Sequence, residues 1–134
     1  TRRRRTPRVA HDPAATGVLP ILVGEATRSL VHDVVFREVD RIKVKGKDEA
    51  VTIYEPLGPE GEVPRGLLDE LKVWNQALRA YRAQQWDQVE VGLLNLQRMS
   101  PACGLYQAYA QKVAEKRRDP PPPDWDGVTA FDEK

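Results

Sequence analysis

The chain has 134 residues, with 21 Lys and Arg against 20 Asp and Glu and a formal net charge of +1. This length accommodates one ordinary domain or two small pieces, and the near-neutral charge argues against a nucleic-acid partner. No apolar stretch approaches the roughly 20 residues of a membrane-spanning helix, so we expect a cytoplasmic chain without a membrane segment. The single cysteine, Cys103, excludes an internal disulfide and, with only two histidines, argues against a closed zinc site.

The two ends of the chain carry opposite charges and little periodic apolar character. Residues 1–15 are rich in arginine and are expected to form a disordered basic leader, with a phosphate-binding or targeting patch at Arg2–Arg5 as the alternative. Residues 119–134 form a Pro-rich acidic tail, which we also expect to be flexible. Because the chain begins at Thr1 and its only methionine is Met99, we expect it to be part of a longer polypeptide or to have lost a segment.

The N-terminal half is expected to begin with a strand and a short helix. Leu19–Val23 is apolar and rich in branched side chains, which favours a buried strand. After Gly24, the segment Glu25–Val31 places Ala26 and Leu30 on one helical face.

A β-hairpin is predicted next. Val34–Val44 alternates apolar residues with charged ones such as Arg37 and Arg41, and the imperfect alternation near Val39–Asp40 predicts a β-bulge. Ala50–Tyr54 alternates again. Two alternating runs joined by a glycine-containing turn are typical of an antiparallel hairpin.

An all-helical region is expected over residues 66–118, after a Pro- and Gly-rich linker at residues 59–65. Apolar residues spaced by three or four predict helices over Leu67–Tyr81, Trp86–Met99 and Pro101–Arg118. The predicted fold class is therefore α+β, a strand–helix–hairpin piece followed by three helices. The side chains expected to face inward are Leu71, Trp74, Leu78, Tyr81, Val89, Leu93, Leu96, Leu105, Tyr106, Tyr109, Ala110 and Val113.

Common catalytic motifs for nucleotide, zinc or acyl chemistry are absent from the sequence. The histidines His11 and His32 are isolated, and Cys103 has no neighbouring base, so we interpret all three as non-catalytic. One local feature is chemically suggestive: Lys45 and Lys47 flank Gly46 at the predicted hairpin turn. Ammonium groups beside an approachable backbone suit phosphate oxygens, although a merely solvated turn is the alternative.

Residues 16–58 contain three motifs in order: a strand-to-helix step, ILVGEAT; a hairpin, FREVDRIKVKGKDEAVTIYE; and an exit, YEPLG. In sequence and spacing they resemble the C-terminal part of a bacterial class III adenylate/guanylate cyclase catalytic domain, with Ala50 where such cyclases usually have proline. The resemblance implies conversion of ATP to cAMP and pyrophosphate across a head-to-tail dimer, with two Mg²⁺ or Mn²⁺ ions held by two aspartates. It also implies that Lys45 contacts the terminal phosphates of the nucleotide.

The other functional motifs of that family precede the ILVGEAT strand, and residues 1–15 resemble none of them. Asp12 is the only acidic residue before Glu25, so two metal-binding aspartates cannot come from this segment. Without a two-metal clamp, in-line displacement at phosphorus has no activated nucleophile. We therefore expect no catalytic residue, no metal ligand and no cofactor in this chain by itself, and activity only with a dimer partner or the missing N-terminal half.

The helical half carries a weaker resemblance. The spacing of Trp86, Val89, Leu93, Leu96 and Pro101 is similar to the later part of a tetratricopeptide repeat. Since one repeat cannot bury its faces alone, we favour a three-helix extension packed on itself or on the cyclase-like piece.

The helices and their PPPPDWDGV ending resemble the C-terminal extension of membrane-anchored bacterial cyclases with an extracytoplasmic sensor, and Trp125 is expected to dock onto the helices. The alternative function is a non-catalytic interaction module that binds a protein partner on the helices.

Overall fold

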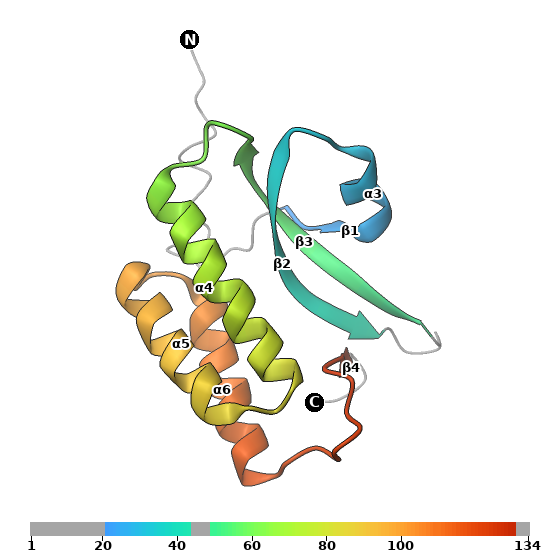
Figure 1. The fold of residues 1–134 in the computed structure, drawn as a ribbon. Helices are drawn as coiled ribbons and strands as arrows, with labels where there is room; N and C mark the ends of the chain where they lie inside the picture. The colour runs from blue at the N-terminus through green and yellow to red at the C-terminus, as the bar shows by residue number, and fades with distance from the viewer. Residues whose placement is uncertain (1–20, 44–48, 131–134) are drawn as a thin grey trace.

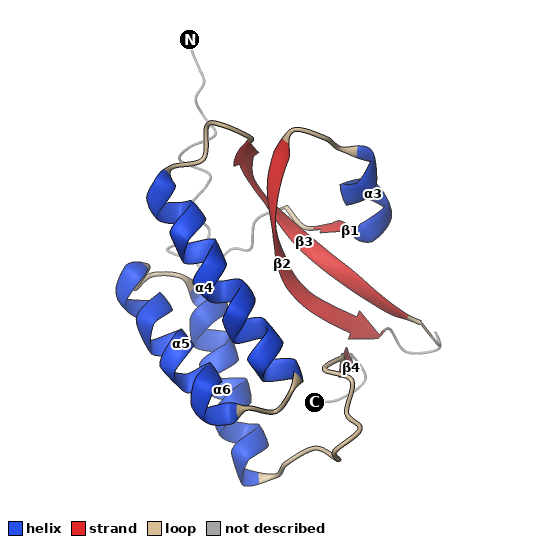
Figure 2. Cartoon of the chain, viewed as in Figure 1, coloured by secondary structure: helices blue, strands red, loops and turns tan. Residues whose placement is uncertain are grey.

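The computed structural model describes residues 21–43 and 49–130 and has a mixed α+β fold (Figure 1). The basic leader predicted at residues 1–15 lies outside this range. In chain order the elements are β1 (Val23–Gly24), α3 (Glu25–Leu30), β2 (Val34–Lys43), β3 (Ala50–Pro59), α4 (Arg65–Arg82), α5 (Trp86–Met99), α6 (Gly104–Arg118) and β4 (Thr129–Ala130). Helices α4, α5 and α6 lie together on one side of the β2–β3 hairpin, and α3 lies on the other (Figure 2).

The sheet has the strand order β1-β3-β2-β4. The β2–β3 pair is antiparallel, as the alternating sequence predicts, and β1 adds antiparallel to β3 through Val23 and Gly24. Strand β4 pairs with β2 in parallel, so the chain returns to the hairpin after the three helices. The long hairpin thus forms the centre of the sheet.

The predicted β-bulge is present in β2. The pairing register with β3 shifts between Glu38 and Asp40, which leaves Val39 without a partner residue across the hairpin. A bulge bends its strand and releases backbone groups from the ladder. Its position matters because the helices dock at this point, as described below.

The first strand differs from its prediction. Leu19–Val23 was expected to be a buried strand. Leu19 and Pro20 lie outside the described residues, and among the rest only Val23 belongs to the observed strand, Val23–Gly24, while Ile21 is 77% exposed. Helix α3 forms where expected and buries none of its residues, with Leu30 80% exposed. Helices α4–α6 cover the opposite side of the hairpin, so no described element covers these apolar side chains.

The three longer helices form within a few residues of the predicted bounds and share one core. Helix α6 begins at Gly104 rather than Pro101, because residues 101–102 form a turn and Cys103, in extended backbone, occupies the position before the helix. Gly92 of α5 lies close enough to Ala77 of α4 that an added Cβ would be 3.2 Å from the alanine Cβ. The buried residues of this core are Trp74, Ala77, Leu78, Ala80, Tyr81, Val89, Leu93, Leu96, Tyr106, Tyr109 and Val113.

Two aromatic side chains attach the helices to the bulge. Trp74 of α4 donates its indole N–H to the carbonyl of Glu38 at 2.7 Å, and Tyr109 of α6 donates its hydroxyl to the carbonyl of Val39 at 2.9 Å. Both rings are buried and lie edge to face, with centroids 5.0 Å apart. The carbonyls around the bulge therefore serve as the docking points for the helical layer.

The flexible tail predicted for residues 119–134 is wrong for the described part of that segment. Residues 119–130 fold back along the helices and end in β4 (Figure 1). Trp125 docks as predicted, with ring centroids 5.3 Å from Tyr81 and 6.2 Å from Trp86, and Lys116 Nζ lies 5.0 Å above its ring. A stiff proline run followed by a large aromatic ring orders the segment because it loses little entropy and buries much area.

Candidate functional site

The phosphate-binding residue predicted from the sequence, Lys45, lies outside the described residues. The structure describes the strand ends that flank its turn, where Lys43 pairs with Ala50. Lys43 also pairs with Ala130 of β4, so the returning tail borders the same end of the hairpin. The structure therefore brings the C-terminal segment to the strand that leads into the predicted site.

The other residues considered from the sequence lie apart from this end. His32 is exposed between α3 and β2, Cys103 is half-buried at the start of α6, and His11 is outside the described range. Within residues 21–43 and 49–130, no group of three or more His, Cys, Asp or Glu side chains could hold a metal ion. In the same ranges, no helix is both long and apolar enough to cross a membrane.

A buried charge network joins the hairpin to the helices, and the sequence did not predict it. Arg37 of β2 is 7% exposed and Glu70 of α4 is 6% exposed. The Arg37 guanidinium donates two hydrogen bonds, of 2.7 and 2.9 Å, to Glu55 of β3. Its Nη1 atom donates to the Tyr106 hydroxyl at 2.7 Å and lies 3.7 Å from Glu70.

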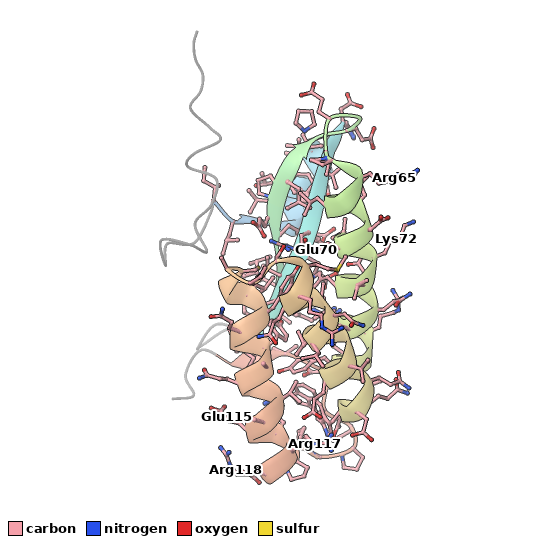
Figure 3. All side chains as sticks on the ribbon, turned by 90° about the vertical axis from the view of Figure 1, so that its left-hand side faces the viewer. Arg65, Glu70, Lys72, Glu115, Arg117 and Arg118 are labelled. Carbon is pink, nitrogen blue, oxygen red and sulfur yellow. The ribbon has the colours of Figure 1, made fainter. Side chains whose placement is uncertain are left out.

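Glu70 completes the network from the helical side. Its carboxylate accepts hydrogen bonds from Tyr106 at 2.5 Å and from Ser100 at 2.7 Å. In Figure 3, Glu70 points toward the sheet, whereas Arg65 and Lys72 of the same helix point outward. One arginine thus lies between two carboxylates from different elements, an arrangement in which each charged group has hydrogen-bonding partners.

Burial and neighbouring charges change the acid–base properties of this network. Burial by itself lowers the pKa of Arg37, but the Glu55 carboxylate and Tyr106 outweigh it, so the pKa is raised. For Tyr106, burial raises the pKa, Arg37 opposes the rise, and the hydrogen bond to Glu70 adds to it. Both side chains are therefore held in their ordinary protonation states at neutral pH, which fits a structural connection rather than proton transfer.

Two further ion pairs tie β2 to the helices on either side of the bulge. Arg82 of α4 contacts Glu38 at 2.7 Å, and Lys112 of α6 contacts Asp40 at 3.2 Å. Thr129 of β4 joins the second pair, donating to Asp40 at 3.3 Å. These two ion pairs and Thr129 therefore link β2 on both sides of the bulge to α4, to α6 and to the tail.

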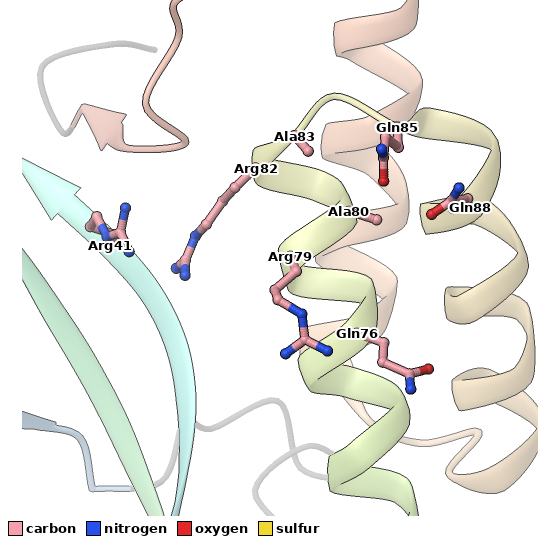
Figure 4. A pocket seen from close by; sticks show the side chains of 8 residues that line it. All are labelled: Arg41, Gln76, Arg79, Ala80, Arg82, Ala83, Gln85 and Gln88. Atoms are coloured by element: carbon pink, nitrogen blue, oxygen red, sulfur yellow. The ribbon is translucent and has the colours of Figure 1, made fainter.

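Arginine side chains also gather in a hollow between β2 and the helices, which we call the arginine groove. Its larger part, of about 780 Å³, is lined by Arg41, Arg79 and Arg82 together with three glutamines of α4 and α5 and the loop between them (Figure 4). A smaller part, of about 270 Å³, shares Arg79 and Arg82 and adds Arg28 of α3. Residues of β2, α3 and α4 thus bring four arginines to two neighbouring hollows that share Arg79 and Arg82.

The sequence offered little indication of the buried charge network or of the arginine groove. Arg37 alternates with apolar residues in β2, which suggests a solvent-facing position, and Arg79 and Arg82 are two of several arginines in the helical half. Their spacing of three places them on one face of α4. Only the packing of α4 beside β2 shows which of these arginines meet.

Comparison with protein-family models, with curated proteins and with solved structures found no match to this chain.

Proposed function

We propose that this chain is the C-terminal part of a class III adenylate cyclase catalytic domain with its helical extension, and that it contributes Lys45 to the binding of nucleotide phosphates. The observation that carries the proposal is the sequence resemblance over residues 16–58, in which three motifs follow one another in the order of that family. The parent reaction converts ATP to cAMP and pyrophosphate, in the cytoplasm. Two Mg²⁺ or Mn²⁺ ions bind to residues supplied from outside this chain.

The described geometry supports this proposal in two ways. The elements β1, α3 and the β2–β3 hairpin follow one another as the motifs require. The described residues from Ile21 to the end of β3 include four exposed large apolar side chains, Ile21, Leu30, Val31 and Val51, which are between 40% and 80% exposed. Exposed apolar side chains are typical of surfaces that pack against another piece of protein, and the proposed occupant is the remainder of the catalytic domain.

The alternative, a module that binds a partner segment between its helices, has less support. The inward faces of α4, α5 and α6 are filled by their own side chains, with Trp74, Leu96 and Tyr106 fully buried. The face toward the sheet is occupied by the bulge of β2. A role as a bracing extension of the hairpin accounts for these contacts.

The proposal is tested by a segment exchange. In an active bacterial class III adenylate cyclase, residues 16–134 of this chain replace the corresponding C-terminal segment, and cAMP and pyrophosphate are measured with ATP and Mn²⁺. We expect the folded chimera to form cAMP and the Lys45→Ala chimera to lose about tenfold or more of that activity, because a fixed cation near the phosphates is removed.

Lys43→Ala is the matched control, since Lys43 is an exposed lysine at the end of β2, two residues before Lys45 in the sequence. It should retain the activity of the chimera. A chimera that folds and dimerises but forms no cAMP, while the unexchanged enzyme does, would contradict the proposal. Formation of cAMP by the isolated chain would contradict its predicted inactivity.

A further inference from the structure

The arginine groove carries more positive charge than its surroundings balance. Its walls present Arg28, Arg41, Arg79 and Arg82, and the one carboxylate that lines it, Glu38, is already paired with Arg82. Among the described residues, the Arg79 guanidinium forms no salt bridge or hydrogen bond, and the Arg41 guanidinium makes one long contact of 3.4 Å, to the carbonyl of Asp126. Charges of one sign gathered at a hollow attract counter-ions.

Arg82 provides the most specific evidence. Its Nη1 atom contacts Glu38, but its Nε and Nη2 atoms are buried and have no hydrogen-bond partner among the described residues. Buried N–H groups in proteins nearly always have an acceptor, and an unpaired one often marks a place where a water molecule or an ion binds. In Figure 4 the Arg82 guanidinium extends from α4 toward Arg41 of β2, across the groove.

The tail holds Arg82 in this position. An added Cβ on Gly127 would be 2.5 Å from Cγ of Arg82, so the glycine backbone lies directly on the aliphatic part of the side chain. Gly127 has φ +79°, a conformation that favours glycine. The guanidinium is thus positioned before any ligand arrives, which lowers the entropic cost of binding.

Neighbouring carboxylates other than Glu38 are engaged elsewhere. The Asp40 carboxylate accepts hydrogen bonds from Lys112, Thr129 and the backbone N–H of Arg41. The Asp126 carboxylate accepts a hydrogen bond from the backbone N–H of Val128. Glu25, near Arg28, accepts the hydroxyl of Tyr54. None of these carboxylates forms a salt bridge with any of the four arginines of the groove among the described residues.

We propose that the arginine groove binds a small soluble anion that carries more than one phosphoryl group, with pyrophosphate as its simplest form. Guanidinium groups present paired N–H donors that match two oxygens of a phosphoryl group. A ligand with several oxygens can accept hydrogen bonds from donors on both walls, one formed by β2 and the other by α4. Among the described residues, no large exposed apolar side chain lines the groove, which favours a soluble anion over a lipid surface. The inference is carried by Arg41, Arg79 and Arg82 and does not rest on the proposed function.

The test is isothermal titration of the full chain with pyrophosphate in low-salt, metal-free buffer. We expect submillimolar binding that weakens by about tenfold in Arg79→Gln and in Arg41→Gln, because each change removes a charge-assisted contact. Arg79 is exposed and unpaired in the described structure, so its replacement should leave folding, measured by circular dichroism, unchanged. Titrations with ATP and with vesicles containing phosphatidylglycerol separate a soluble anion from a lipid head group as the source of the phosphoryl group.

Two variants make the result specific. Arg65→Gln removes an exposed arginine from the same helix, about 21 Å from Arg79 along the helix axis. This variant should bind pyrophosphate as the unchanged chain does. Lys45→Ala should also retain binding. The proposal is overturned by the absence of pyrophosphate binding, by an equal loss in Arg65→Gln, by binding that depends on Lys45 alone, or by binding to the vesicles only.

Discussion

The hydroxyl group of Tyr109 in α6 donates a hydrogen bond of 2.9 Å to the carbonyl of Val39, 70 residues earlier in β2. Val39 is the residue that the bulge leaves unpaired with β3. The bulge thus provides an acceptor within the sheet, and a buried tyrosine of the helical layer uses it. This contact, with that of Trp74 to Glu38, explains how a short sheet is held against three helices.

Removing the Tyr109 hydroxyl should therefore destabilise the fold. In Tyr109→Phe the Val39 carbonyl loses its partner while the ring stays in place, so we expect the free energy of unfolding in urea to fall by about 1–2 kcal/mol. Tyr81→Phe is the matched control, because Tyr81 is equally buried but its hydroxyl makes no hydrogen bond to another described residue. An equal loss in both variants would contradict the role assigned to the bulge.

Arg37 should be more costly to replace than any exposed arginine. Arg37→Met leaves the carboxylates of Glu55 and Glu70 without their shared cation, and breaking a buried ion pair costs about 3–5 kcal/mol. The same substitution at Arg65, exposed at the start of α4, should change stability by less than about 0.5 kcal/mol. Urea unfolding of both variants measures the difference, and similar midpoints would show that the network contributes little.

The contact between the tail and α4 predicts opposite effects for two glycine substitutions. Gly127→Ala should destabilise the chain by about 1–3 kcal/mol, because its Cβ would collide with the side chain of Arg82 at a positive φ. Gly66→Ala, within α4 and with no atom near the added Cβ, should stabilise it by about 0.5–1 kcal/mol. Thermal unfolding distinguishes them, and a neutral Gly127→Ala would mean that the tail does not pack as described.

The chain should resist ionisation of its tyrosines at alkaline pH. Burial raises the pKa of Tyr81, Tyr106 and Tyr109, and the pKa of Tyr54 rises to about 12 through burial and its hydrogen bond to Glu25. Each folded-state pKa exceeds the unfolded value of about 10. The stability that comes from keeping these hydroxyls protonated in the folded chain is therefore fully present below pH 10. It is lost as the pH rises through the folded values.

Tyrosinate absorbance near 295 nm measures this directly. It should stay low above pH 10 and then appear together with the loss of circular dichroism, since the buried hydroxyls ionise only when the chain unfolds. Independent, gradual ionisation of all four tyrosines in the folded chain would contradict the burial described. The urea-unfolded chain, with an ordinary tyrosine pKa, is the reference.

Local sequence patterns predicted most of the secondary structure. Side chains spaced by three or four, such as Val89, Leu93 and Leu96, are all at most 2% exposed, because a helix places such positions on one face. Alternation predicted the hairpin, and its interruption predicted the bulge near Val39. The phosphate contact at Lys45 stays a prediction, because the residue lies outside the described ranges.

The structure alone shows which charged residues are interior. Alternation groups Arg37 with Arg41 and Lys43 on the polar face of β2, yet Arg37 is buried and Lys43 is exposed. The difference depends on Glu55 and Glu70, which come from β3 and α4 and lie 18 and 33 residues away in sequence. Nothing in the neighbourhood of Arg37 in the sequence encodes these partners.

The sequence by itself determined the helices, the hairpin, the bulge and the docking tendency of Trp125, since each depends on periodicity or on the chemistry of one side chain. The tertiary structure decided that the tail returns to β2, that Arg37 is enclosed, and that four arginines meet at one groove. These outcomes depend on how the helical layer packs across the bulge. Such packing is set by contacts between residues far apart in the chain, which local patterns do not contain.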